Sequence, residues 1–154
     1  MGEKTTRRTQ IMNKPRFGGV FSPAIYSLTN WRNMHPKDVL KRIRKRQGRC
    51  YELAGIALLK ADGWSLVHGE ANCLPDVPGG HAWLVSGEAV YDPVLHCEMP
   101  LAEYTTRYGG KECRRYSKTE AATMMMFTRK YGPWTAEEER RFLTEGQLAP
   151  ATRL

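Results

Sequence analysis

The sequence lacks any long apolar run. No segment is long enough to cross a membrane, and no apolar signal segment follows the N-terminus. Internal repeats and interior low-complexity linkers are also missing, so the 154 residues fit one domain that can bury a core without disulfides. Residues 1–20 mix Lys and Arg with Thr, Gly and Pro and show no periodicity. We therefore expect a flexible basic tail over residues 1–20 and a single domain over residues 21–154.

Cysteines are few, and none of them has a spacing typical of a zinc site. Cys-x-x-Cys and His-x-x-x-His are both absent. In a chain without a secretion signal, free thiols in a reducing compartment are expected, which indicates a cytoplasmic location; the cysteines are Cys50, Cys73, Cys97 and Cys113. A zinc site is the competing use of such residues, and it would draw on Cys73, Cys97, Cys113, His68 or His96. Adjacent His96 and Cys97 are awkward joint ligands, so we expect no metal and no other cofactor.

Positive charge is concentrated in the N-terminal third. The formal net charge is +8, yet residues 1–50 carry 13 basic and 2 acidic side chains and the remainder has a balance of −3. The densest run is Lys41–Arg46, which the pattern predicts as the end of a helix beginning near Pro36, with Val39, Leu40 and Ile43 as its apolar side. Cations in a last helical turn oppose the helix dipole favourably, so a solvated helix end explains the run. The alternative is a surface for weak, salt-sensitive binding of nucleic acid or an acidic protein.

Cys50 lies where a helix is expected to begin. Apolar or small residues recur after it at helical spacing, and they are Leu53, Ala54, Ala57, Leu58 and Ala61. Gly48 precedes this stripe and Gly63 follows it, which predicts a helix over about residues 49 to 62. The partial positive charge of a helix N-terminus favours a thiolate, the nucleophilic form of cysteine. Free backbone N–H groups there can also face an oxyanion, and nearby Gln47 is a candidate second donor.

His81 and Asp92 are expected on two strands of a hairpin. Residues 81–85 and 88–92 are each predicted to form a short strand, with Ser86-Gly87 as a two-residue turn between them. This turn pairs His81 directly with Asp92, with their Cβ atoms about 4.5 to 5.5 Å apart. If the residue numbers of each pair add up to two more or two less than in this register, both side chains stay on one face as a diagonal pair. If the sum changes by one, they lie on opposite faces. A thiol, its base and a group that orients the base are the components of a nucleophilic triad.

These elements, in this order, resemble the core of the transglutaminase-like family, which belongs to the wider papain-like group of cysteine proteases and acyltransferases. The resemblance covers roughly residues 48 to 94 and rests on Gly48-Arg49-Cys50, the helix after it, the strand-like Gly63–Gly69, Gly80-His81-Ala82-Trp83 and Tyr91-Asp92-Pro93. It implies catalysis by Cys50, His81 and Asp92 through a thioester. The chain departs from the family pattern in the tight hairpin between His81 and Asp92, where many relatives carry a longer one, and this leaves the substrate class open.

The C-terminal part is predicted to be scaffold. A short helix is expected over Leu101–Tyr108 and a further strand over Glu112–Tyr116. Two capping boxes, at residues 117–120 and 135–138, predict helices that extend to about Lys130 and about Glu145. The expected fold is therefore α+β with a papain-like, transglutaminase-like core: a catalytic cysteine at a helix N-terminus, packed on a small antiparallel sheet that carries the histidine and the aspartate.

Two functions of different classes follow. The first is a thiol-dependent amide hydrolase or acyltransferase, of the cysteine protease, deamidase or transglutaminase type, acting on a protein or peptide. Hydrolysis ranks first because nothing in the sequence identifies an amine-binding site. The second is a catalytically inactive binding module of the same fold, whose basic N-terminal third binds nucleic acid or an acidic protein. No membrane partner is expected for either function.

Overall fold

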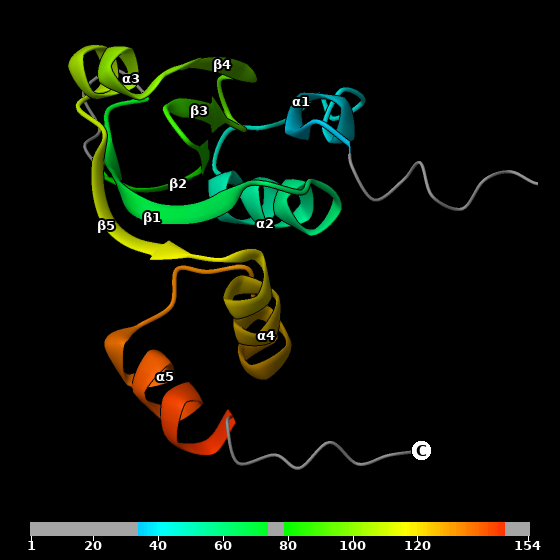
Figure 1. The fold of residues 1–154 in the computed structure, drawn as a ribbon, viewed down its shortest axis with the longest axis vertical. Coiled ribbons are helices and arrows are strands. Elements are labelled where there is room, and N and C mark those ends of the chain that lie inside the picture. The colour runs from blue at the N-terminus through cyan, green and yellow to red at the C-terminus, as the bar shows by residue number, and fades with distance from the viewer. Residues whose placement is uncertain (1–33, 74–78, 147–154) are drawn as a thin grey trace, which may run out of the picture.

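The computed structural model describes residues 34–73 and 79–146, and the expected tail at residues 1–20 lies outside these ranges. The described chain is α+β (Figure 1). Its five-stranded antiparallel sheet has the order β4-β3-β2-β1-β5. The strands are β1 (Ser65–Ala71), β2 (Gly79–Ser86), β3 (Ala89–Asp92), β4 (Cys97–Pro100) and β5 (Lys111–Tyr116). The helices are α1 (Pro36–Val39), α2 (Cys50–Lys60), α3 (Leu101–Tyr108), α4 (Lys118–Thr128) and α5 (Ala136–Arg141), followed by a π-helical turn, η1 (Phe142–Gly146).

Helix α2 covers one face of the sheet with the expected apolar stripe. All the stripe residues are fully buried, and they are Leu53, Ala54, Ala57, Leu58 and, just after the helix, Ala61. They pack on the residues of β1, β2 and β3 that face this side, namely Leu66, Ala82, Leu84 and Tyr91. The helix ends at Lys60 because Ala61 has extended backbone angles. The prediction of a helix over about 49 to 62 is therefore confirmed to within one or two residues at each end.

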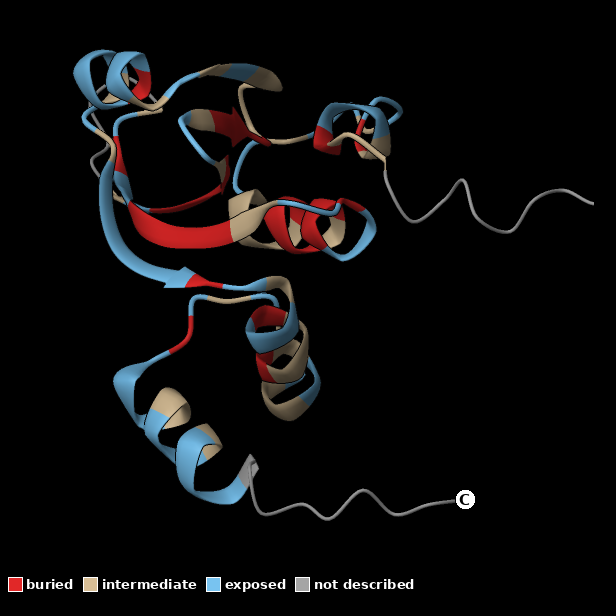
Figure 2. Cartoon of the chain, in the orientation of Figure 1, coloured by how far each residue is buried: buried red, intermediate tan, exposed pale blue. Residues whose placement is uncertain are grey.

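A second core lies on the opposite face of the sheet. Successive residues of a strand point to opposite faces of the sheet. The residues next to those that pack on α2 therefore pack on the side of α3. This core contains Val67, Trp83, Val85 and Val90, with the fully buried ring of Tyr104 from α3. Figure 2 shows buried residues running through β1, β2 and β3 and along one side of α2. Because both faces of the central strands are covered, side chains on either face can be held away from water.

The hairpin between β2 and β3 has a register that differs from the direct pairing expected. Its turn is Gly87-Glu88, and the paired residues are Ser86 with Ala89, Val85 with Val90 and Leu84 with Tyr91. The residue numbers of each pair add up to two more than in the expected register, because the turn lies one residue later. A shift of two preserves the faces of the sheet. The prediction of a direct cross-strand His81–Asp92 pair is therefore wrong, and the two residues form the diagonal arrangement.

The basic run is not the end of a helix, contrary to the expectation for residues 41–46. Helix α1 ends at Val39, and residues 43–46 have no regular structure. The carbonyl oxygen of Leu40 accepts the backbone N–H of Ile43 at 3.0 Å and Nη2 of Arg46 at 2.5 Å. Nη1 of Arg46 also donates to the Pro93 carbonyl at 3.0 Å. The Arg46 side chain thus holds a loop against the chain at Pro93. In a continued helix, the cations of the run would lie three or four residues apart on one side and repel one another.

The C-terminal elements agree with the expected capping signals. Ser117 and Thr135 each accept the backbone N–H of the glutamate three residues later, and each glutamate bonds back to the backbone of its cap. The helices end earlier than expected, at Thr128 and Arg141, although η1 continues the second one to Gly146. The helix at Leu101–Tyr108 has the expected bounds, and β5 begins one residue earlier than expected. Among the residues described, no helix has both the length and the apolar character needed to cross a membrane.

Candidate active site

Cys50 is the first residue of α2, and its backbone surroundings leave hydrogen-bond donors free. The N-cap residue, Arg49, makes no side-chain cap and instead pairs with Glu52 at 2.7 Å. The first intrahelical bond in this turn runs from the Leu53 N–H to the Arg49 carbonyl at 2.9 Å. The first N–H groups of a helix have no intrahelical partner, so those of the turn that begins at Cys50 are available to a ligand. The half-buried thiol therefore lies where an anion is favoured.

A close contact between α2 and β2 places Cys50 beside His81. The Tyr51 side chain of the first α2 turn reaches β2, since a Cβ built on Gly80 would lie 2.7 Å from the Tyr51 hydroxyl. Cys50 precedes Tyr51, and His81 follows Gly80. Both line one cavity of about 130 Å³, with Gly48, Ala71, Cys73, Gly79, Gly80 and Val94 as the other lining residues.

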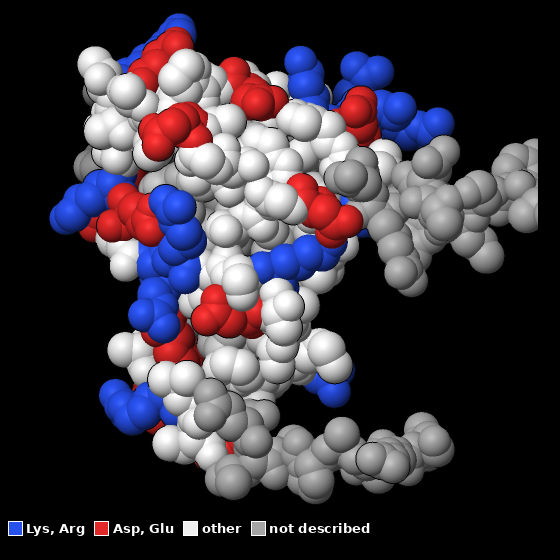
Figure 3. Space-filling view, viewed as in Figure 1, with Lys and Arg blue, Asp and Glu red and all other residues white. Residues whose placement is uncertain are grey.

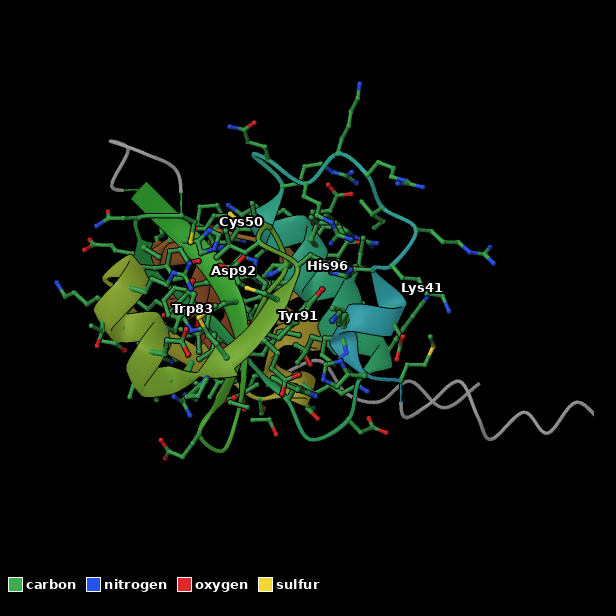
Figure 4. The ribbon with its side chains drawn as sticks, turned by 90° about the horizontal axis from the view of Figure 1, so that it is seen from above. Lys41, Cys50, Trp83, Tyr91, Asp92 and His96 are labelled. Carbon is green, nitrogen blue, oxygen red and sulfur yellow. The ribbon has the colours of Figure 1, made fainter. Side chains whose placement is uncertain are left out.

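The site lies at the open end of the β2–β3 hairpin. His81 shares a sheet face with Trp83, with the two rings stacked at 6.0 Å between centroids, so it points away from the apolar stripe of α2. Cys50 nevertheless lines the same cavity as His81, and the β2–β3 pairing extends only from Leu84 to the turn. In Figure 4 Cys50 and Asp92 lie close together at one end of the sheet, whereas Lys41 lies well away from them.

His81 and Asp92 form a buried ion pair. Nε2 of His81 lies 2.7 Å from Oδ2 of Asp92; the histidine is 6 % exposed and the aspartate fully buried. Burial opposes the charged form of each, but their mutual hydrogen bond and attraction prevail. The pKa of His81 is therefore raised and that of Asp92 lowered. The pair is charged in the neutral pH range, which is the form in which a carboxylate orients and stabilises an imidazolium.

Asp92 is held by donors from three other segments. Its Oδ1 accepts the backbone N–H groups of Val94 at 2.8 Å and Leu95 at 2.9 Å. Its Oδ2 accepts the Tyr104 hydroxyl at 2.8 Å and the Cys73 thiol at 3.3 Å, in addition to His81. The carboxylate thus has a fixed orientation, with Oδ1 facing the loop after β3 and Oδ2 facing His81.

The hydrogen bonds of His81 settle the roles of its two ring nitrogens. An ionised carboxylate can only accept, so Nε2 carries a proton and donates it to Asp92. In neutral imidazole the other nitrogen, Nδ1, is then an acceptor. The proximity of Cys50 is among the influences that raise the pKa of His81, and both residues line one cavity. With Nε2 bonded to Asp92, Nδ1 is the ring nitrogen that can exchange a proton with the Cys50 thiol.

Cys73 and Tyr104 were not expected at the site. Cys73 follows β1, and Tyr104 lies in the middle of α3. The alternation of strands and the amphipathic pattern of α3 do not reveal which side chains meet across 12 to 31 residues of sequence. Gln47, the candidate oxyanion donor, lies in the turn before α2, is exposed, and is not among the residues that line the cavity.

The residues considered for a zinc site are dispersed. His68 is buried among the rings of Tyr51, Tyr116 and Trp134, with centroids 4.8 to 5.0 Å away. His96 bonds through Nδ1 to the Tyr91 hydroxyl at 2.7 Å, and Cys113 is exposed on β5. In the described ranges, one group of three metal-ligating side chains does come together: Cys73, His81 and Asp92, with ligand atoms within 4.8 Å of one another.

Comparison of the chain with models of protein families, with curated proteins and with solved structures finds no match. The resemblance to the transglutaminase-like family therefore rests on the residues of the chain itself. What the site can do follows from its geometry: a cysteine at a helix N-terminus, a histidine whose Nδ1 can hold or release the cysteine proton, and a buried carboxylate that fixes the histidine.

Proposed function

We propose that the protein is a thiol-dependent amide hydrolase or acyltransferase, of the cysteine protease, deamidase or transglutaminase type, with Cys50 as nucleophile, His81 as base and Asp92 as the group that orients the base. The observation that carries this proposal is the buried 2.7 Å His81–Asp92 pair next to the Cys50 thiol in one cavity. A structural salt bridge alone would not require a thiol at a helix N-terminus beside the ring. The combination is the one that nucleophilic catalysis by cysteine needs.

The proposed reaction begins from the Cys50 thiolate, whose proton is held on Nδ1 of His81 and completes the imidazolium of the charged pair. The thiolate attacks the carbonyl carbon of a carboxamide or peptide bond, and the tetrahedral oxyanion is stabilised by the free N–H groups of the first α2 turn. His81 then gives its proton to the leaving amine or ammonia, which leaves a thioester on Cys50. Water, deprotonated by His81, releases an acid; an amine attacking in the same way releases a new amide. Asp92 stabilises the imidazolium throughout.

The size of the cavity bears on how a substrate enters. A volume of about 130 Å³ is small beside the roughly 300 to 1,000 Å³ of pockets that enclose whole small ligands. It suits one carboxamide or one peptide unit, with the rest of the substrate outside. A broader groove of about 520 Å³ adjoins it at Gly48, and Tyr51, Arg129, Tyr131 and Pro133 are among its lining residues. A polypeptide substrate can lie along this groove with its reacting amide at Cys50.

The finer features of fold and location belong to the same proposal. A helix with the nucleophile at its N-terminus, next to strands that carry histidine and aspartate, supports a papain-like, transglutaminase-like core. The described cysteines are all free thiols, which is typical of proteins in a reducing compartment, so we propose a cytoplasmic location.

The proposal is tested by incubating the protein with a cell extract and searching by mass spectrometry for new acids from amides, new cleavages and new isopeptide links. Cys50→Ala should remove every product, because no other atom can carry the acyl group. Cys113→Ala is the matched control, since Cys113 is exposed on β5 and outside the cavity, and it should retain them. Products formed equally by Cys50→Ala would refute the assignment.

A second candidate function rests on the basic loop, Lys41–Arg46. Its exposed cations are Lys41, Arg42, Arg44 and Lys45, and none of them pairs with an acidic side chain in the described ranges. Figure 3 shows Lys and Arg side chains gathered beside α1. A non-catalytic module could bind a polyanion there. Heparin affinity measured across salt concentrations tests this: replacing Lys41 and Arg42 by Gln should weaken binding and reduce its salt dependence.

A further inference from the structure

We propose that Cys73, His81 and Asp92 form a Zn²⁺ site whose occupation shuts off the Cys50–His81 couple. The three residues supply one thiolate, one imidazole nitrogen and one carboxylate oxygen, which are the usual protein ligands of zinc. Their ligand atoms all lie within 4.8 Å of one another. Three protein ligands leave a fourth position open, as in zinc sites that retain a water.

The observed separations are close to those that zinc requires. Bonds of about 2.0 to 2.3 Å in a tetrahedron place neighbouring ligand atoms about 3.3 to 3.6 Å apart. Cys73 Sγ already lies 3.3 Å from Asp92 Oδ2. His81 Nε2 lies 2.7 Å from the same oxygen and would have to move by roughly half an ångström. The ligand atoms of Cys73 and His81 lie within 4.8 Å of each other and would have to approach by up to about 1.2 Å to reach the spacing of a tetrahedral site.

The surroundings of the three residues also fit an ion. Asp92 would coordinate through Oδ2, while Oδ1 stays bonded to the N–H groups of Val94 and Leu95 and fixes the carboxylate. Tyr104 donates to Oδ2 at 2.8 Å and lies 3.6 Å from Cys73 Sγ, so it can continue to support the bound carboxylate. Cys73 and His81 line the 130 Å³ cavity, which provides a path for the ion.

The charges balance when the ion binds. The Cys73 thiolate and the Asp92 carboxylate together carry two negative charges, which neutralise Zn²⁺ where the aspartate is fully buried. Binding releases the thiol proton of Cys73 and, because zinc needs neutral imidazole, one proton from charged His81. The ion replaces the Nε2–H donor to Asp92 and leaves no ligand charge unpaired.

The effect on the thiol follows from the two nitrogens of one ring. Zinc takes the lone pair of Nε2, so the single proton of the neutral imidazole must reside on Nδ1. The metal-bound ring has lost its own positive charge and no longer stabilises the Cys50 thiolate, and its Nδ1, already protonated, cannot take the proton of the Cys50 thiol. This inhibitory consequence rests on the proposed function, in which Nδ1 is the base, whereas the metal site itself does not depend on it.

The experiment uses the full chain freed of metal with a chelator, then titrated with Zn²⁺ in competition with a chromophoric chelator and, in parallel, with Co²⁺. One equivalent should bind, and Co²⁺ should give the absorption of a thiolate-ligated tetrahedral ion. Cys73→Ser should weaken binding at least about 100-fold and remove the thiolate band, because losing only an outer partner of a ligand costs about 10- to 100-fold. Cys50→Ala, Cys97→Ser and Cys113→Ser should bind as the unaltered chain does.

Two further measurements make the outcome decisive. X-ray absorption of the unaltered protein with one equivalent of Zn²⁺ should show a single sulfur ligand with nitrogen and oxygen ligands, independent of any variant. Zn²⁺ should slow iodoacetamide alkylation of Cys50 in the unaltered chain and in Cys113→Ser. A chelator should restore the rate, and Cys73→Ser should show no slowing.

Equal binding of Zn²⁺ by Cys73→Ser, or the absence of a sulfur ligand, would overturn the site. Binding through Cys73 that leaves the Cys50 rate unchanged would overturn the inhibition. Failure of the proposed function is distinct, because it appears in metal-free protein as the absence of preferential Cys50 alkylation.

Discussion

Replacing His68 by Phe should change how stability depends on pH. The imidazole is 7 % exposed and packs among three aromatic rings, and its Nε2 has no hydrogen-bond partner in the described structure. Burial opposes the charged form and lowers the pKa of His68 from 6.5 to about 4. As pH falls through this interval, the unfolded chain binds a proton at His68 that the folded chain does not. The free energy of unfolding therefore decreases toward acid pH.

The size of this effect follows from the two pKa values. Between pH 7 and pH 5 the preferential protonation of unfolded His68 removes about 2 kcal/mol, at roughly 1.4 kcal/mol per pKa unit over the range that titrates. His81 has the opposite sign, because its pKa is raised in the folded chain and its contribution is retained at low pH and lost as pH rises through the folded pKa. The free energy of unfolding of the unaltered protein can thus change little with pH. The contribution of His68 is isolated by comparing the unaltered chain with His68→Phe at each pH.

Urea unfolding of the unaltered chain and of His68→Phe at both pH values is the assay. Any change in packing caused by the larger ring contributes equally at each pH and cancels in the comparison. The stability of the variant relative to the unaltered chain should improve by about 2 kcal/mol from pH 7 to pH 5. An unchanged difference would refute the conclusion that His68 is buried in its neutral form.

Other substitutions test the packing and the hydrogen bonds of the site. Gly69→Ala should destabilise the fold by about 2 kcal/mol or more in urea unfolding, because the added Cβ would overlap the Lys111 carbonyl and the Trp83 ring; a loss under half a kcal/mol would contradict the close approach. Tyr104→Phe should cost about 1.5 to 3 kcal/mol by the same assay, since a buried hydroxyl donates to a charged carboxylate, and no loss would argue against this bond. Asp92→Asn should lower stability by about 3 to 5 kcal/mol and reduce turnover, because an amide nitrogen would replace an oxygen that now accepts several donors; unchanged thermal unfolding would contradict this.

Helices were the part of the fold most readily predicted from the sequence. The apolar stripe after Cys50 and the capping boxes at Ser117 and Thr135 depend on residues three or four apart, and local spacing determines their structure. The helix predicted through Lys41–Arg46 was wrong because a distant contact decides it. Arg46 bonds to the carbonyls of Leu40 and Pro93, and the second of these lies 47 residues away.

The candidate site was predictable only in part. Because side chains alternate between the two faces of a sheet, the prediction that His81 and Asp92 share a face holds although the turn lies one residue later than predicted. Cys73 and Tyr104 carry no comparable signal, because their contacts with Asp92 are tertiary: Cys73 follows β1, and Tyr104 comes from α3 on the sheet face opposite α2. The approach of the Tyr51 hydroxyl to Gly80 is likewise visible only in the structure.

The most direct test of the proposed catalytic site is the order in which the cysteines react. Metal-free protein is treated with a limiting amount of iodoacetamide near neutral pH, and peptide mapping measures the modified fraction of each thiol. The account predicts that Cys50 reacts ahead of Cys73, Cys97 and Cys113, and that His81→Ala removes this preference because the thiol loses its base. Alkylation of the four cysteines without order, or of another cysteine first, would contradict it.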